Sequence, residues 1–168
     1  MMRKILLTVF MAFTALVANA QDGRFAVWYG VNMANVTGGK SEFKFLSIGV
    51  DYTAPLNDAF DWTVGLGYVT KGAKEWNPMF IQADGNAAWK FVNNDDFRMS
   101  VLTGPYAGYV IDDDDNNNAN LDVGWQAGIK AEYRQFSLRI GYELGMIEIA
   151  KDEGIKNRNF YIRIGYSF

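Results

Sequence analysis

Hydrophobic and polar residues alternate one by one along most of this chain, which is the period of a β-strand with two different faces. The clearest case is the end of the chain, where Phe160, Ile162, Ile164, Tyr166 and Phe168 alternate with polar, charged or small residues. We find no segment with the 3.6-residue period of an amphipathic helix. The pattern therefore predicts an all-β protein.

Eight strands can be placed on this pattern. We predict them over residues 24–36, 44–53, 60–70, 79–92, 97–111, 121–133, 136–146 and 160–168. The facing of the fifth strand is ambiguous, because Pro105 interrupts it and large apolar side chains stand on both of its faces. We assign its apolar face to Phe97, Met99, Val101 and Tyr109.

The connections between these strands alternate in length. Short turns are predicted at residues 54–59, 93–96 and 134–135, and longer polar segments at 37–43, 71–78, 112–120 and 147–157. Short turns at one end and longer loops at the other are typical of outer-membrane barrels. An even number of strands then places both termini on the short-turn side, which is the periplasmic side in such barrels, and the longer loops outside the cell.

The N-terminal segment reads as a secretory signal. Arg3 and Lys4 precede an apolar run over residues 5–17, and Ala18-Asn19-Ala20 forms a small-residue cleavage site. The run is well short of the ~20 residues that a membrane-spanning helix needs. We therefore predict a cleaved signal peptide at residues 1–20 and a single barrel domain at residues 21–168.

Alternation alone does not separate a membrane barrel from a soluble, lipocalin-like barrel that binds an apolar ligand, because the two differ only in which face points outward. Three features favour lipid outside, one of which is that the apolar faces carry almost no charged residues. The polar face is rich in glycine, which suits a narrow lumen better than a solvated surface. Aromatic residues also stand at the short-turn ends of the apolar faces, as the membrane interface selects. These aromatics are Phe25, Tyr52, Trp62, Trp89, Phe97, Tyr133, Phe136, Tyr166 and Phe168.

Charged residues fall on the opposite, inward face, where acids and bases are nearly balanced. The set is Asp51, Asp61, Asp84, Lys90, Arg98, Asp122, Lys130, Glu132, Arg139, Glu143 and Arg163. An eight-stranded barrel is just wide enough for its own side chains, so these charges should pair and fill the lumen. We expect Arg139 or Arg163 to contact Glu143 or Glu132. The alternative is a path for protons or ions along the network.

Three segments carry a resemblance to a known family. They are YVTKGAK at residues 68–74, GPYAGYV at 104–110 and GWQAGIKAEY at 124–133. With them the chain resembles the small outer-membrane β-barrel proteins of the porin-family or PorT-like type, over nearly the whole mature chain. The resemblance implies an eight-stranded antiparallel up-and-down transmembrane β-barrel in the cell outer membrane, inserted by the barrel-assembly machinery through the C-terminal strand.

The composition excludes several common kinds of catalytic and metal site. The chain contains no histidine and no cysteine, which removes the Ser-His-Asp and Cys-His arrangements and most zinc sites. We therefore predict no enzymatic activity and no cofactor. The formal net charge is −3, with no basic tract to bind nucleic acid.

One acidic run is a candidate cation site. Asp112, Asp113, Asp114 and Asp115 could supply oxygen ligands to calcium. The run lacks the glycine and the final glutamate of an EF-hand loop, so we interpret it as a solvated acidic loop.

The pattern as a whole favours a monomeric barrel with a filled lumen and a non-enzymatic role in the envelope. Its outer loops would contact a ligand, a host or an envelope partner. Two alternatives remain: a narrow pore or component of a secretion or uptake machine, and the soluble lipocalin-like barrel.

Overall fold

A computed structural model describes residues 23–36, 42–71, 78–112, 121–147 and 156–168. The predicted signal peptide at residues 1–20 lies outside this part of the chain. No helix in the described residues is long and apolar enough to cross a membrane.

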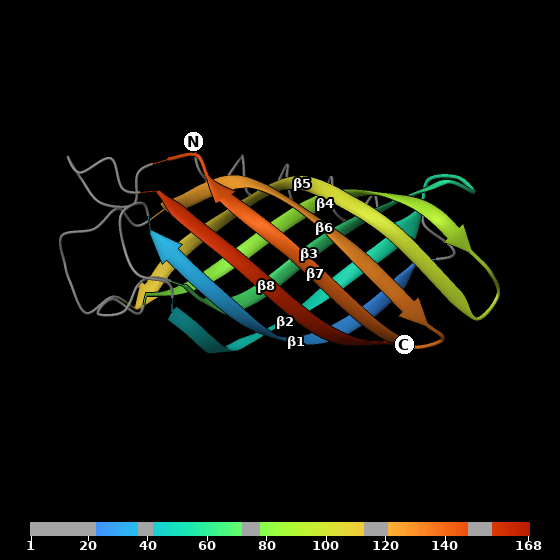
Figure 1. Cartoon of the computed structure of the whole chain (residues 1–168), viewed down its shortest axis with the longest axis horizontal. Helices are drawn as coiled ribbons and strands as arrows, with labels where there is room; N and C mark the ends of the chain where they lie inside the picture. The colour runs from blue at the N-terminus through green and yellow to red at the C-terminus, as the bar shows by residue number, and fades with distance from the viewer. Residues whose placement is uncertain (1–22, 37–41, 72–77, 113–120, 148–155) are drawn as a thin grey trace, which may run out of the picture.

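The described residues form eight strands that close into a barrel, in which each strand pairs antiparallel with its sequence neighbours and β1 pairs with β8. Figure 1 shows the strands crossing the barrel at a tilt, with the short turns gathered at one end. The predicted eight-stranded antiparallel barrel is confirmed. The strands are β1 (Arg24–Val36), β2 (Glu42–Pro55), β3 (Phe60–Thr70), β4 (Met79–Asn93), β5 (Phe97–Asp112), β6 (Leu121–Tyr133), β7 (Phe136–Gly145) and β8 (Asn157–Ser167).

Strand length suits a membrane. The strands contain between 10 and 16 residues, and a tilted strand needs about 9–11 to cross the hydrocarbon core. β1, β3 and β6 begin and end at the predicted residues. The largest shift at a single end is in β8, which begins at Asn157, three residues before the predicted start.

The two faces of the sheet are inverted relative to a water-soluble barrel. Apolar side chains point outward and are exposed, as Ile164 is at 58%, whereas polar ones such as Asp122 point into the lumen and are fully buried. In β5, Val101 and Tyr109 face outward, and Leu102 and Tyr106 are buried inside. The predicted facing of this strand, and of the other seven, agrees with the structure over most of their length.

A one-residue irregularity in β2 breaks the predicted alternation. Gly30 pairs with Ser47 but Asn32 pairs with Lys44, so β2 has one residue more than β1 between these pairs. Phe45 and Leu46 therefore both face outward, as the two residues of a β-bulge do. Strict alternation from Leu46 would have put Lys44 on the apolar face. The bulge instead turns its side chain into the lumen, where it is buried.

β4 and β5 approach closely at one point. Their Cα pairing passes from Asp84–Tyr106 to Ala87–Thr103 and skips the residues between. Pro105 lies in this gap and has no N–H to donate to the ladder. A Cβ atom on Gly104 would lie 1.8 Å from the carbonyl oxygen of Gly85, whereas a Cβ on Gly85 would meet nothing within 4 Å.

This contrast predicts different outcomes for two neighbouring substitutions. Gly104→Ala should destabilise the barrel by about 1–3 kcal/mol, because the methyl group overlaps backbone that cannot move aside. Gly85→Ala, which points into open space on the outer face, should leave stability unchanged. Urea unfolding of the refolded barrel in lipid vesicles, followed by tryptophan fluorescence, measures both. Equal stabilities would contradict the close approach.

Candidate functional site

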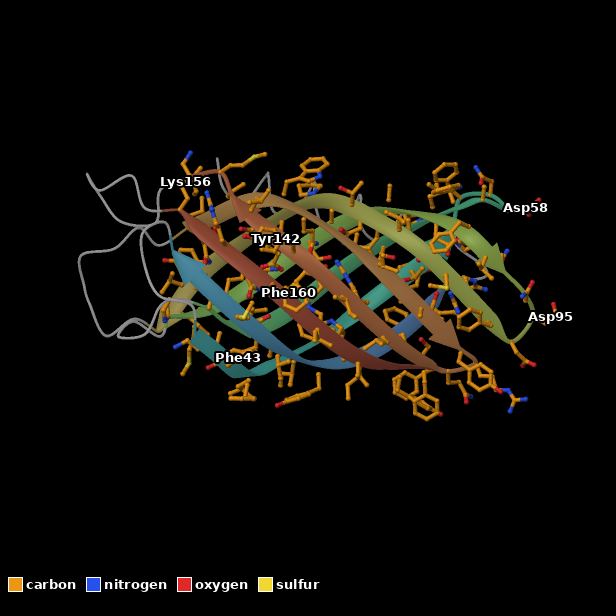
Figure 2. The ribbon with its side chains drawn as sticks, in the orientation of Figure 1. Phe43, Asp58, Asp95, Tyr142, Lys156 and Phe160 are labelled. Carbon is orange, nitrogen blue, oxygen red and sulfur yellow. The ribbon has the colours of Figure 1, made fainter. Side chains whose placement is uncertain are left out.

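The lumen holds the candidate site, and its charged side chains lie in three layers along the barrel axis. The loop-end layer is centred on Lys71, the central layer on Arg139 and Arg163, and the turn-end layer on Glu132. Figure 2 shows polar side chains filling the interior along the length of the barrel.

Lys71 closes the loop-end layer. Its Nζ lies 3.3 Å from Oδ2 of Asp122 and 2.7 Å from Oε2 of Glu143, and all three side chains are fully buried. The same Nζ sits 4.2 Å from the centroid of the Tyr106 ring, a cation–π contact. One ammonium group therefore joins two carboxylates and an aromatic face.

Side-chain amides donate hydrogen bonds to the two carboxylates of this layer. Asn157 donates to Asp122 at 3.0 Å, and Gln82 and Asn159 donate to Glu143 at 2.9 and 3.0 Å. Hydrogen bonds of this kind are what make a buried charge tolerable.

The sequence prediction missed Lys71, which it placed in an exposed loop over residues 71–78. The alternation of faces along β3 does predict that Lys71 is buried. Asp61, Gly65 and Val69 of β3 face the lumen at odd positions, and continuing that alternation one step past the end of the strand brings Lys71 inside.

Arg163 occupies the middle of the central layer. Its Nη2 lies 3.2 Å from Oε1 of Glu143 and its Nη1 3.7 Å from Oδ2 of Asp84. The guanidinium also lies between the rings of Trp28 and Tyr161, 4.3 Å from each centroid. The contact between Arg163 and Glu143 is one of those the sequence led us to expect.

Arg139 stands directly opposite Arg163 in the pairing of β7 with β8. Like charges facing each other across a strand pair repel, and nearby acids offset this. Arg139 Nη1 lies 3.8 Å from Asp51 and 3.9 Å from Asp84, and its Nε donates to the Tyr161 hydroxyl at 3.0 Å. The two acids flank Gly65, whose missing side chain leaves room for both carboxylates.

The turn-end layer is built around one acid. Glu132 is contacted by Lys130 at 3.2 Å, Arg24 at 3.4 Å and Arg98 at 3.8 Å. Glu132 therefore pairs with these cations, whereas Arg139 and Arg163 pair with Asp51, Asp84 and Glu143. Lys90 and Asp61 form a separate ion pair at 2.7 Å in the same layer.

The aromatic residues predicted at the short-turn end stand on the outer face, and some of their rings contact one another. Phe25 and Tyr52 have ring centroids 4.7 Å apart, and Phe136 and Tyr166 5.4 Å apart. Tyr52 differs from the others because it is only 4% exposed, covered by Phe25 and Trp62. Phe97, Trp89, Tyr133 and Phe168 are exposed.

A second group of outward aromatics, which the sequence reasoning did not single out, lies towards the loop ends of the strands. Its members are Phe43, Tyr68, Tyr109, Trp125, Tyr142 and Phe160. Figure 2 labels three of them. Most of them already fell on predicted apolar faces. Their nearness to the longer loops could have predicted a second group of aromatics at that end.

The acidic run lies at the edge of the described chain. Asp112 is the last residue of β5, and Asp113, Asp114 and Asp115 lie outside the described residues.

Comparisons with known proteins identify the fold. No protein-family model matches the chain, and no curated protein matches it. Among solved structures, the outer-membrane enzyme PagL is 10% identical over 82% of this chain and 97% of its own, with a TM-score of 0.58. Neisserial surface protein A is 13% identical over 86% and 97%, with a TM-score of 0.53. Ail of Yersinia pestis, in complex with a heparin analogue, is 14% identical over 88% and 100%, with a TM-score of 0.50. At these identities the likeness shows the fold alone, which is that of the small outer-membrane β-barrels.

The buried position of Lys71 predicts a large effect on stability. Lys71→Met should cost about 3–5 kcal/mol, because it leaves two buried carboxylates without their shared cation. Arg134→Gln is the control: it breaks the Arg134–Asp96 pair, whose side chains are 63% and 64% exposed, and should cost less than about 1 kcal/mol. Urea unfolding in lipid vesicles compares them. A Lys71→Met variant as stable as the control would contradict the assigned ion pairs.

Proposed function

We propose that this chain is an integral outer-membrane β-barrel with a filled lumen and a non-enzymatic role in the cell envelope. The observation that carries the proposal is the inverted barrel itself, with an apolar exterior and a lumen occupied by ion pairs. Aromatic side chains near both ends of the exterior fit the two interfaces of a bilayer.

The arrangement of the two faces disfavours the soluble alternative. A lipocalin-like barrel keeps its ligand in an apolar interior and its polar side chains outside. Here the interior carries Lys71, Arg139, Arg163 and their acidic partners, and large apolar residues cover the outside. An exterior of this kind exposed to water would aggregate.

The non-enzymatic assignment rests on composition and on the closed lumen. The chain has no histidine or cysteine for nucleophilic or acid–base catalysis of the common kinds. PagL shares the fold and is an enzyme, but the likeness at 10% identity extends to the fold alone. With the centre and loop end of the lumen filled, contact with a host or partner on the loop side of the membrane falls to the connections at that end.

We also propose how the chain is exported, oriented and inserted. The signal peptide at residues 1–20 is removed, both termini face the periplasm, and the barrel-assembly machinery inserts a monomer through the C-terminal strand. The three segments quoted above support a place among the PorT-like barrels. Cell fractionation tests the location: recovery in the soluble fraction, without heat-modifiable migration on gels, would overturn it.

A depth-dependent substitution tests whether the exterior faces lipid. Ile140→Arg, in the middle of the outer face of β7, should destabilise the barrel in vesicles by about 2–4 kcal/mol. Phe136→Arg, at the turn end of the same strand and face, should cost about 0–1 kcal/mol. Unfolding in lipid vesicles measures both values. Two small and equal costs would contradict a lipid-facing exterior.

A narrow pore is the second candidate. Several buried polar atoms in the lumen have no hydrogen-bond partner within the described structure, among them Arg139 Nη2, Gln126 Nε2 and Asn157 Oδ1. Such atoms are commonly satisfied by internal water. Planar-bilayer recordings separate the two functions: the filled barrel should show no steady conductance, and a reproducible channel would favour the pore.

A further inference from the structure

Inside the lumen at its turn end, cationic side chains outnumber acidic ones. Arg24, Arg98 and Lys130 all contact the single carboxylate of Glu132, at distances of 3.2–3.8 Å. Lys90 is already paired with Asp61 at 2.7 Å. Three cations therefore share one carboxylate, and positive side chains are in excess over acids inside this layer.

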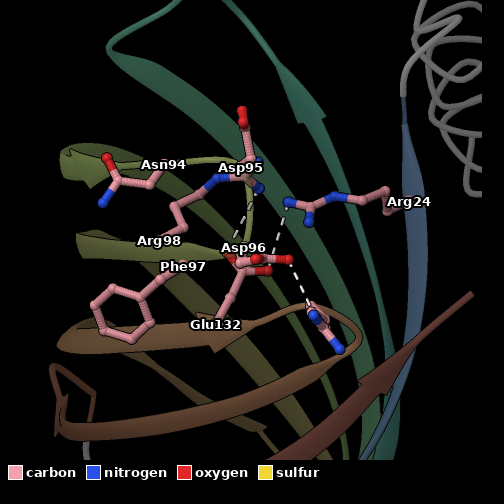
Figure 3. Close-up of a pocket in the computed structure, with 8 residues that line it drawn as sticks. Arg24, Asn94, Asp95, Asp96, Phe97, Arg98 and Glu132 are labelled. Atoms are coloured by element: carbon pink, nitrogen blue, oxygen red, sulfur yellow. Dashed lines mark hydrogen bonds and ion pairs between the residues drawn. The ribbon is translucent and has the colours of Figure 1, made fainter.

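A cavity of about 210 Å³ opens beside these cations. Arg24, Thr53, Pro55, Asp61, Lys90 and Arg98 line it. A smaller cavity adjoins it and is drawn in Figure 3, where Arg24 and Arg98 reach towards Glu132 from opposite sides. The central layer of Arg139 and Arg163 closes the lumen beyond, so the cavity opens at the turn end.

The two arginines keep donors for a ligand. Arg98 uses its Nε to donate to Asn93 at 3.0 Å, and its Nη1 is 3.8 Å from Glu132, longer than a hydrogen bond. The nearest ion-pair distance of Arg24 to Glu132 is 3.4 Å. Their side chains are 27% and 31% exposed, so solvent and small solutes can reach them.

We propose that this cavity binds a compact oxyanion, the carboxylate or phosphate group of a molecule on the turn-end side of the membrane. The planar fork of a guanidinium matches both groups and binds them through paired, charge-assisted hydrogen bonds. Arg24 and Arg98 supply the two forks, and the hydroxyl of Thr53, which lines the cavity and shares a hydrogen bond with the hydroxyl of Thr63 at 3.0 Å, supplies a further polar contact.

Acids around the mouth limit what can enter. Asp95 and Asp96 lie in the turn before β5 and line the smaller cavity, and Asp96 pairs with Arg134 at 3.1 Å. Together with Asp61 they would repel an extended polyanion. The site therefore suits a single small anionic group better than a nucleic acid or a polysulfated chain.

Titration with small anions tests this proposal on the full chain refolded in nanodiscs of zwitterionic lipid. Inorganic phosphate and acetate are added at constant ionic strength, with chloride as the reference anion, and amide NMR shifts are followed. Saturable shifts are expected around residues 24, 53 and 98. Arg24→Gln and Arg98→Gln should each weaken the binding at least tenfold.

Arg158→Gln is the matched control, because it removes an exposed arginine from the opposite, loop end of β8 and should leave the affinity unchanged. Heat-modifiable migration of every variant verifies folding. No saturable shift with either anion, or equal weakening by Arg158→Gln, would overturn the site.

The source of the anion is distinguished by repeating the titration in nanodiscs that contain phosphatidylglycerol. Weaker apparent phosphate binding there assigns the site to lipid headgroups, and unchanged binding assigns it to a free or periplasmic anion. The experiment does not depend on the role of the outer loops, so its failure would leave the proposed function standing.

Discussion

The charged side chains in the centre and at the loop end of the lumen must neutralise one another, because the apolar outer face of the barrel offers them no other partner. Glu143 shows how this constraint organises the structure. On β7, it accepts hydrogen bonds or ion pairs from Lys71 after β3, from Gln82 on β4, and from Asn159 and Arg163 on β8. One buried carboxylate thus ties four parts of the barrel together, and removing Lys71 or Arg163 takes away one of the two cations that compensate its charge.

The sequence predicted the strands well wherever one apolar and one polar face alternate without interruption. β1, β3 and β6 match their predicted bounds for this reason. The pattern failed at β2, because a bulge is a one-residue event decided by the fit between neighbouring strands. Phe45 and Leu46 look like successive residues of an ordinary strand, and the sequence does not show that both face outward and turn Lys44 inside.

The sequence predicted which charged residues line the lumen, but it predicted much less well which of them form ion pairs. Alternation places Arg163, Glu143 and Glu132 in the lumen, but which of them meet depends on the register around the closed barrel. Glu132 lies more than a hundred residues from Arg24 in sequence, yet the two are 3.4 Å apart. Ion pairs therefore fill the lumen in its centre and at its loop end. This filling leaves the turn-end cavity and the loops as the places where ligands can bind.

Spin labelling along β7 tests the inverted barrel most directly. The chain has no cysteine, so single cysteines at successive positions from residue 136 to residue 145 can carry a nitroxide in lipid vesicles. Electron paramagnetic resonance then measures collisions with oxygen, which is enriched in lipid, and with a water-soluble nickel chelate. Oxygen accessibility should alternate with a period of two residues and be high at Ile140→Cys, with low nickel accessibility there. High nickel accessibility at the outward positions would contradict the account.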